Sequence, residues 1–295
     1  MKYWLLAIRP KTLWASVGPV IIGTAMAFGD GVGHFPAAFA ALFGALFVQI
    51  GTNLANDYFD GKSGVDAPDR KGPIRVTQSG LIPPSAVKWA FIGCFTAAAF
   101  VSLYLVARAG TPVLIIGILS ILSGWLYTGG PKPLSHSGLG EIFVLVFYGP
   151  VAVAGTYFVQ SFEWNIVIVV AGLAPGLFSM AILAVNNLRD IDTDRRAGKK
   201  TLAVRYGRTF ARLEYLVCVV AACFIPAAVY LITQEFSLIL LSSLVFLFLL
   251  PAINTVFTSE DGNQLNSALA QTGIGLLIYS LLFAVTWIMQ PVILR

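Results

Sequence analysis

Two short segments of the chain hold half of its acidic residues. Of the 14 Asp and Glu residues, seven lie in residues 57–69 and residues 190–194. Both segments repeat polar residues at a spacing of four, and the residues concerned are Asn56 and Asp60 in the first and Asn186, Asp190 and Asp194 in the second. Residues four apart share one face of a helix, so each segment can present its side-chain oxygens in one direction.

Such a pattern of oxygen atoms predicts cation binding. Carboxylates repeated on one helix face repel each other by about 1 kcal/mol or more per close pair near a surface, and a cation relieves that repulsion. Asp and Asn oxygens suit a hard ion such as Mg²⁺, which often binds one or two carboxylates together with substrate phosphate oxygens. The Arg and Lys residues of the same loops suit those phosphates. The alternative is a pair of solvated loops whose acids balance their bases; the doubled pattern favours a site.

The composition indicates what kind of protein must position these segments. The 295 residues are 57% hydrophobic and only 11% charged, with a mean hydropathy of +0.81. A soluble domain carries about 25% charged residues. A water-soluble enzyme, a disordered chain and a nucleic-acid-binding protein are therefore excluded. The sequence predicts a polytopic membrane protein with one domain over residues 1–295.

Nine apolar stretches are expected to cross the membrane, each near the length of about 20 residues that a helix needs for this. None contains a charged residue, and they comprise residues 12–28, 35–56, 89–107, 109–128, 142–160, 164–185, 215–233, 236–257 and 268–289. We therefore predict an all-α bundle of nine transmembrane helices. The acidic segments follow the second and sixth of them, so they lie on the same side.

The basic residues predict the orientation of this bundle. If the N-terminus is cytoplasmic, 17 of the 19 Lys and Arg residues lie on the cytoplasmic side, and only Arg108 and Arg295 lie outside. This strong bias follows the positive-inside rule. Both acidic segments are then cytoplasmic, and the location expected is a cell membrane, with a bacterial inner membrane favoured.

Two acidic clusters on one membrane face suggest a specific substrate. Two Mg²⁺ ions held by such clusters would clamp a diphosphate. A diphosphate handled by a membrane-embedded enzyme implies a lipid whose tail stays in the bilayer. A prenyl diphosphate is the natural candidate.

At these residues the chain resembles the UbiA superfamily of intramembrane aromatic prenyltransferases, which have nine transmembrane helices and two Asp-rich motifs. The motifs correspond here to Asn56, Asp57, Asp60 and Asp66, and to Asp190 and Asp194. Within the superfamily the chain is most similar to the 1,4-dihydroxy-2-naphthoate polyprenyltransferases, through residues 9–12, 23–24, 53–60, 66–73, 127–128, 139–141 and 186–202. Glu141 stands where several of these relatives have Asp.

The resemblance implies an activity. It is the Mg²⁺-dependent transfer of a polyprenyl group to 1,4-dihydroxy-2-naphthoate with loss of CO₂, which gives demethylmenaquinone for menaquinone biosynthesis. The implied partners are the prenyl diphosphate, the aromatic acceptor and membrane lipid. No nucleic acid and no obligate protein partner is indicated.

Resemblance and local chemistry together assign roles to individual residues. The expected metal ligands are Asn56, Asp57, Asp60, Asp66, Asp190 and Asp194, of which Asp60, Asp190 and Asp194 are the candidate catalytic residues. The candidate diphosphate contacts are Arg70, Arg75, Lys132 and Lys199. Arg189 is expected to hold the neighbouring carboxylates, and Asp192 to point elsewhere. At most two of four aromatic residues are expected to stabilise an allylic cation, and the four are Trp14, Tyr58, Phe59 and Tyr127.

Three other functions are weighed against this one. Another branch of the superfamily would act on 4-hydroxybenzoate, homogentisate or a tetrapyrrole. A membrane transporter would carry charges near the bilayer midplane, yet the predicted spans contain none. A CDP-alcohol phosphotransferase would keep both pairs of Asp residues in one segment, whereas the two segments here are about 130 residues apart.

Overall fold

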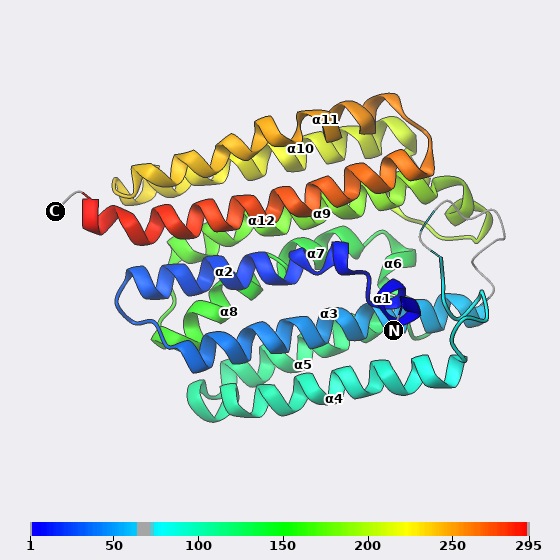
Figure 1. Cartoon of the computed structure of the whole chain (residues 1–295), viewed down its shortest axis with the longest axis horizontal. Helices are drawn as coiled ribbons and strands as arrows, with labels where there is room; N and C mark the ends of the chain where they lie inside the picture. Colours follow the sequence, from blue (N-terminus) through cyan, green and yellow to red (C-terminus); the bar gives the residue numbers. More distant parts are fainter. Residues whose placement is uncertain (1, 64–71, 73, 294–295) are drawn as a thin grey trace.

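A computed structural model describes residues 2–63, 72 and 74–293, and these residues are mostly helical and include no strand. Long helices run side by side along one axis of the molecule (Figure 1). In chain order the elements are α1 (Lys2–Ile8), η1 (Pro10–Thr12), α2 (Trp14–Gly29), α3 (Phe35–Ser63), α4 (Pro84–Ala109), α5 (Thr111–Leu126), α6 (Leu134–Ser137), α7 (Gly140–Phe147), α8 (Pro150–Ser161), α9 (Ile166–Arg196), α10 (Leu202–Thr233), η2 (Ser237–Leu244), α11 (Val245–Thr258) and α12 (Gly262–Ile293).

The predicted all-helical membrane fold is confirmed, but the predicted count of nine spans is not. Within the described residues, seven helical stretches are long and apolar enough to cross a membrane. An eighth is added if α1–η1 and α2, which are bent by 51° relative to each other, form one span. The remaining predicted span corresponds to α5, which has only 16 residues. The chain is thus a multi-pass membrane protein.

The centre of the bundle is formed by α9 and α12, the two spans with the largest buried share. Helix α2 packs against both of them and against α8. A Cβ atom on Gly23 of α2 would lie 2.5 Å from the carbonyl oxygen of Val153 in α8, so only glycine permits this approach. Small residues at such contacts are typical of helices that pack in a bilayer. The outer helices expose large apolar side chains instead, among them Phe100, Val217 and Phe224.

One span is broken in its middle. Helix α7 ends at Phe147 and α8 begins at Pro150, within a single apolar stretch from Gly140 to Ser161. Proline has no N–H and starts a helix well. A Cβ atom on Gly149 would lie 2.7 Å from the carbonyl oxygen of Gly172 in α9, so the break is pressed against α9. Irregular backbone at membrane depth is tolerated where protein buries it or where it lines a cavity.

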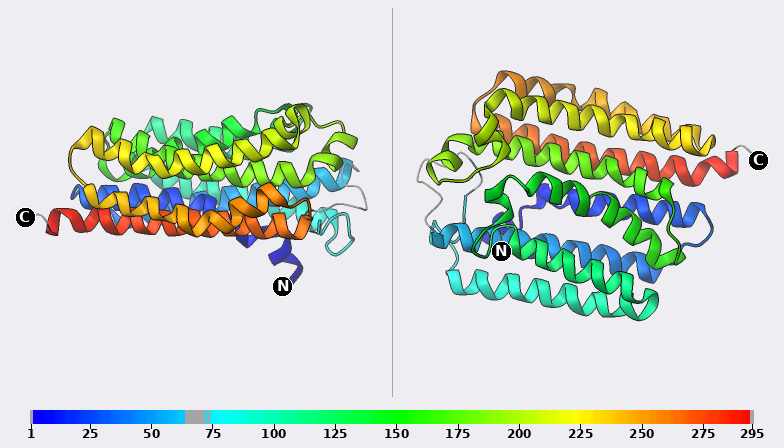
Figure 2. Two further views of the ribbon diagram at one scale, coloured as in Figure 1. Left: turned by 90° about the horizontal axis from the view of Figure 1, so that it is seen from above. Right: turned by 180° about the vertical axis from the view of Figure 1, so that it is seen from behind.

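As predicted, the helices that precede the two acidic segments continue into them. Helix α3 runs on to Ser63 and α9 to Arg196. Their C-terminal ends lie at the same end of the molecule, beside α6 and the N-terminal helix α1 (Figures 1 and 2). Two of the predicted site residues, Asp66 and Arg70, fall outside the described residues.

Candidate active site

The two acidic segments meet in one polar pocket of about 60 Å³. Its lining comes from both motif helices, from the N-terminal segment and from the loops after α3, α5 and α9, and consists of Arg9, Asn56, Asp60, Arg75, Tyr127, Ser135, Asn186, Asn187, Asp190, Thr193, Asp194, Lys199 and Thr201. The polar residues spaced by four in each segment therefore share one face, as predicted.

Each carboxylate of the pocket is held by a base. The Arg75 guanidinium lies 2.5 Å from Asp60. The Lys199 ammonium lies 3.2 Å from Asp194 and 3.9 Å from Asp60, so it bridges the two motif helices. All of these side chains are buried or nearly so. The bases neutralise the repulsion that the crowded carboxylates would otherwise suffer.

Arg189 does hold the neighbouring polar residues, as predicted. Its guanidinium donates to both carboxylate oxygens of Asp190, at 2.8 and 2.6 Å, and to the side-chain amide oxygen of Asn186 at 2.8 Å. A third contact, to Asn266 at 2.5 Å, ties the second motif to α12. Arg189 is itself buried and does not line the pocket. Arg189 therefore orients the Asp190 and Asn186 side chains from outside the pocket.

Two Asp residues of the motifs lie outside the pocket. Both oxygens of Asp57 accept backbone N–H groups, from Val76 at 3.1 Å and Thr77 at 2.9 Å, and the residue is buried. Asp57 thereby holds the backbone beside Arg75 in place. Asp192 is exposed and pairs with Arg208 at 2.6 Å, so it points elsewhere, as predicted.

The bases of the pocket match the prediction in part. Arg75 and Lys199 line it, whereas Lys132 is exposed and lines neither this pocket nor the neighbouring cavity. Arg9 lines the pocket but was not among the predicted site residues. The signal that could have identified it is its place in residues 9–12, one of the stretches that carry the family resemblance.

The loop between α5 and α7 closes one side of the pocket. The buried Ser135 hydroxyl lines it without a hydrogen-bond partner among the described residues, and so is open to a ligand. The backbone carbonyl of His136 accepts the Lys200 N–H at 2.9 Å, which fastens the two loops together. Burial lowers the pKa of the His136 imidazole, and the Lys199 ammonium lowers it further.

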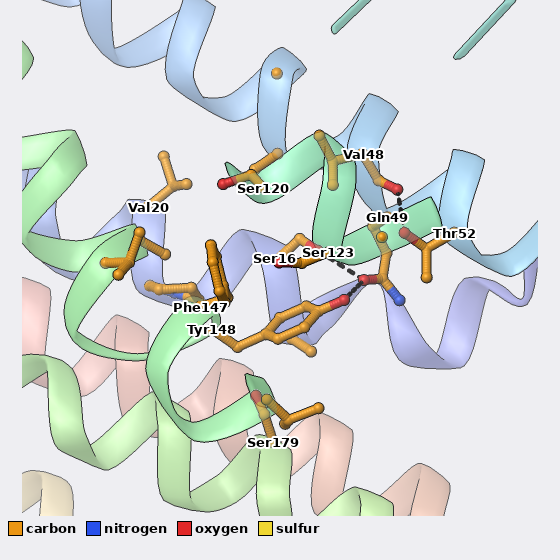
Figure 3. Close-up of a pocket in the computed structure, with 18 of the residues that line it drawn as sticks. Ser16, Val20, Val48, Gln49, Thr52, Ser120, Ser123, Phe147, Tyr148 and Ser179 are labelled. Carbon is orange, nitrogen blue, oxygen red and sulfur yellow. Dashed lines mark hydrogen bonds between the residues drawn. The ribbon is translucent and has the colours of Figure 1, made fainter. Parts of the chain in front are cut away.

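The polar pocket adjoins a larger, mostly apolar cavity of about 310 Å³ inside the bundle (Figure 3). Arg9, Asn56, Tyr127 and Asn186 line both spaces. Tyr127 is the one member of the four predicted aromatic residues that lines either space within the described part of the chain. Phe143, Phe147 and Tyr148 of the broken span line the cavity as well.

The chemistry of the pocket suits Mg²⁺, although the described residues contain no ready-made metal centre. No three His, Cys, Asp or Glu side chains among them converge closely enough to hold an ion. The side chains of the pocket that could ligate a metal ion are nevertheless those of Asp, Asn, Ser and Thr. They offer oxygen atoms, the type of ligand that Mg²⁺ prefers.

Comparison with known proteins identifies the family. The UbiA prenyltransferase family matches residues 16–281. A 1,4-dihydroxy-2-naphthoate octaprenyltransferase of Escherichia coli is 38% identical over 292 residues, 95% of this chain and 93% of that protein. Its counterpart in Mycobacterium tuberculosis is 36% identical over 281 residues, 95% of each chain. The chain belongs to the UbiA prenyltransferase family.

Solved structures agree on the fold. A UbiA homologue from Archaeoglobus fulgidus, bound to DMAPP and Mg²⁺, superimposes with a TM-score of 0.68. It shares 17% sequence identity, and the match covers 97% of this chain and 98% of that one. At this identity the likeness shows the fold alone.

Proposed function

We propose that this protein transfers a polyprenyl group from a prenyl diphosphate to 1,4-dihydroxy-2-naphthoate, releasing CO₂ and diphosphate and forming demethylmenaquinol, the reduced form of demethylmenaquinone. The observation that carries the proposal is the junction of a polar pocket with an apolar cavity through four shared residues. A prenyl diphosphate has the same division into a charged head and a hydrocarbon tail. The names of the relatives, which match almost the whole chain, support the naphthoate as acceptor.

Asp60, Asp190, Asp194 and Asn56 would hold Mg²⁺ in the polar pocket. When bound, the ion stabilises the negative charge that grows on the departing diphosphate. Asp66, outside the described residues, remains a predicted ligand. For Asp57 we propose a different role from the one expected, because both of its oxygens already accept backbone N–H groups.

The bases of the pocket would bind the diphosphate oxygens. Arg9, Arg75 and Lys199 line the same pocket as the acids, and a substrate diphosphate can replace the carboxylates as their partner. Lys132 and Arg70 remain predictions, and the exposure of Lys132 argues against a direct contact. Arg189 keeps Asp190 and Asn186 oriented throughout.

The cavity would shelter the reacting carbon. As the C–O bond to the diphosphate breaks, the allylic carbon becomes cationic, and the apolar wall excludes water that would capture it. Tyr127, at the junction, can stabilise that charge with its ring face. The electron-rich naphthoate attacks through the carbon that bears the carboxylate. The electrons of the carboxylate bond return to the ring as CO₂ leaves.

A competition assay tests the acceptor. Purified protein would be given Mg²⁺, geranylgeranyl diphosphate and equal amounts of 1,4-dihydroxy-2-naphthoate and 4-hydroxybenzoate, with products identified by mass. We expect the prenylated, decarboxylated naphthoate to dominate. Shape alone discriminates by about 1–3 kcal/mol, so some product from 4-hydroxybenzoate is compatible with this. A preference for 4-hydroxybenzoate would move the protein to another branch of the family.

A further inference from the structure

The apolar cavity contains a patch of polar side chains that lies deeper in the helix bundle than the polar pocket does. Gln49 of α3 and Ser120 of α5 each lie seven residues from a junction residue, Asn56 and Tyr127 respectively. At 1.5 Å per residue this is two helical turns, or about 10 Å, deeper in the bundle. Ser123 on α5, Ser16 on α2 and Tyr148 at the α7–α8 break complete the patch (Figure 3).

The centre of the patch is the Gln49 amide. Its oxygen accepts hydrogen bonds from the Tyr148 hydroxyl and, at 3.4 Å, from the Ser16 hydroxyl. These two contacts fix the side chain, which is only 6% exposed. Its Nε2 atom, in contrast, has no hydrogen-bond partner among the described residues, although Gln49 lines the cavity. Nε2 is not one of the fully buried atoms that lack a partner, so it is accessible from the cavity, and its N–H groups are available to a ligand that accepts hydrogen bonds.

The broken span explains why Tyr148 reaches Gln49. Tyr148 follows the last residue of α7, and the backbone of Gly149 is not helical and lies against α9, so the regular helix is interrupted at this point. The interruption lies in the middle of the span, and the Tyr148 hydroxyl lies at the cavity there. Discontinuous helices at this depth commonly build binding sites for polar groups.

A prenyl tail cannot be the ligand of this patch, because a hydrocarbon has no atom that accepts a hydrogen bond. We propose that Gln49 is a specificity-determining residue that donates its side-chain N–H to an oxygen of the aromatic acceptor, with Tyr148 and Ser16 holding the amide in place. This inference rests on the proposed function, and it locates the acceptor on the α3–α5–α7 side of the cavity. The diphosphate stays in the adjoining polar pocket.

Two substitutions of Gln49 test the role of its N–H group. Gln49→Glu keeps oxygen atoms for Tyr148 and Ser16 but replaces the donor with an acceptor, and Gln49→Leu removes both. The readouts are the KM of each substrate and the Kd of the naphthoate, measured from its own fluorescence without prenyl diphosphate. Ser179→Ala is the matched control: Ser179 also lines the cavity, but its hydroxyl donates to the Pro175 carbonyl of its own helix.

Both Gln49 variants should bind the acceptor about tenfold more weakly, the effect of leaving one hydrogen bond of the acceptor unmade. The KM of the prenyl diphosphate should stay within about twofold, as should both constants in Ser179→Ala. Thermal melting of each variant reports whether it folds. If the Glu and Leu variants fail to fold, Tyr148→Phe, which frees the amide to rotate, should weaken acceptor binding in the same selective way.

Unchanged acceptor binding in the folded variants, or a rise in the KM of the prenyl diphosphate instead, would overturn the inference. Either result would leave the proposed function intact, provided that the unmodified protein prenylates the naphthoate. Failure of the unmodified protein on the naphthoate, in turn, would refute the proposed function. The two failures are therefore distinguishable within one set of assays.

Discussion

The ammonium group of Lys199 lies 3.2 Å from a carboxylate oxygen of Asp194. The same ammonium lies 3.9 Å from Asp60, in the other motif helix. A single base after α9 thus joins the two acidic segments. When a diphosphate and its metal enter, Lys199 can exchange its carboxylate partners for phosphate oxygens without leaving the pocket.

Lys199→Met should raise the KM of the prenyl diphosphate and lower turnover. Hydrogen bonds between charged groups contribute about 1.5–3 kcal/mol, so we expect a loss of about 10- to 100-fold in kcat/KM. Lys200→Met is the control, because the Lys200 side chain is exposed and its hydrogen bond within the described part of the chain is made by the backbone N–H. Equal kcat/KM in the two variants would contradict the role of Lys199.

Asp60→Ala and Asp190→Ala should each abolish turnover without preventing membrane insertion. Each substitution removes a carboxylate of the polar pocket, and the loss of charge stabilisation should amount to several kcal/mol. Activity would be measured over a range of Mg²⁺ concentrations, with membrane insertion followed by fractionation. Near-normal activity of either variant at saturating Mg²⁺ would remove these residues from the proposed site.

Asp57→Ala should behave differently from the Asp60 variant. The two backbone N–H groups of Val76 and Thr77 lose their acceptors, at a cost of about 1–3 kcal/mol for each buried group left unpaired. We expect a lower melting temperature and reduced turnover, while the Mg²⁺ concentration that half-saturates the remaining activity stays the same. A large increase in that concentration, with an unchanged melting temperature, would restore Asp57 as a metal ligand.

Gly23→Ala should destabilise the bundle. The added methyl group would lie 2.5 Å from the Val153 carbonyl oxygen and push α2 and α8 apart, and overpacking of this kind typically costs about 1–3 kcal/mol. Gly93→Ala on α4 is the control, since a Cβ atom there meets nothing within 4 Å. Melting temperatures in detergent should fall only for the Gly23 variant. A similar fall in both variants would mean that the close α2–α8 contact is not the reason for the lower melting temperature.

The acidic segments should face the cytoplasm. In a background with the three native cysteines replaced, Lys132→Cys should react with an impermeant thiol reagent only after the membrane is opened. Glu163→Cys, exposed at the other end of the bundle, should react in intact cells. The positive-inside bias of the basic residues is the reason for this orientation. The reverse labelling pattern would invert the topology.

The sequence by itself determined those features that depend on neighbouring residues. Apolar runs of about 20 residues predicted the seven helical stretches of the described residues that are long enough to cross a membrane, although not the count of nine, and the spacing of four placed Asn56 with Asp60 and Asn186 with Asp190 and Asp194 on single faces. Both properties follow from the geometry of one helix and from the cost of placing charge in a bilayer. The family resemblance then connected these faces to Mg²⁺ and a diphosphate.

Tertiary structure alone decided which of these residues meet. Asp57 and Asp60 are close in the sequence and identical in type, yet one binds the backbone of residues 76 and 77 and the other lines the pocket. Arg9 reaches the pocket from the N-terminal segment, and Tyr148 reaches Gln49 because its span is broken. These arrangements depend on contacts between segments up to about 190 residues apart, and no local pattern encodes how such helices pack against each other.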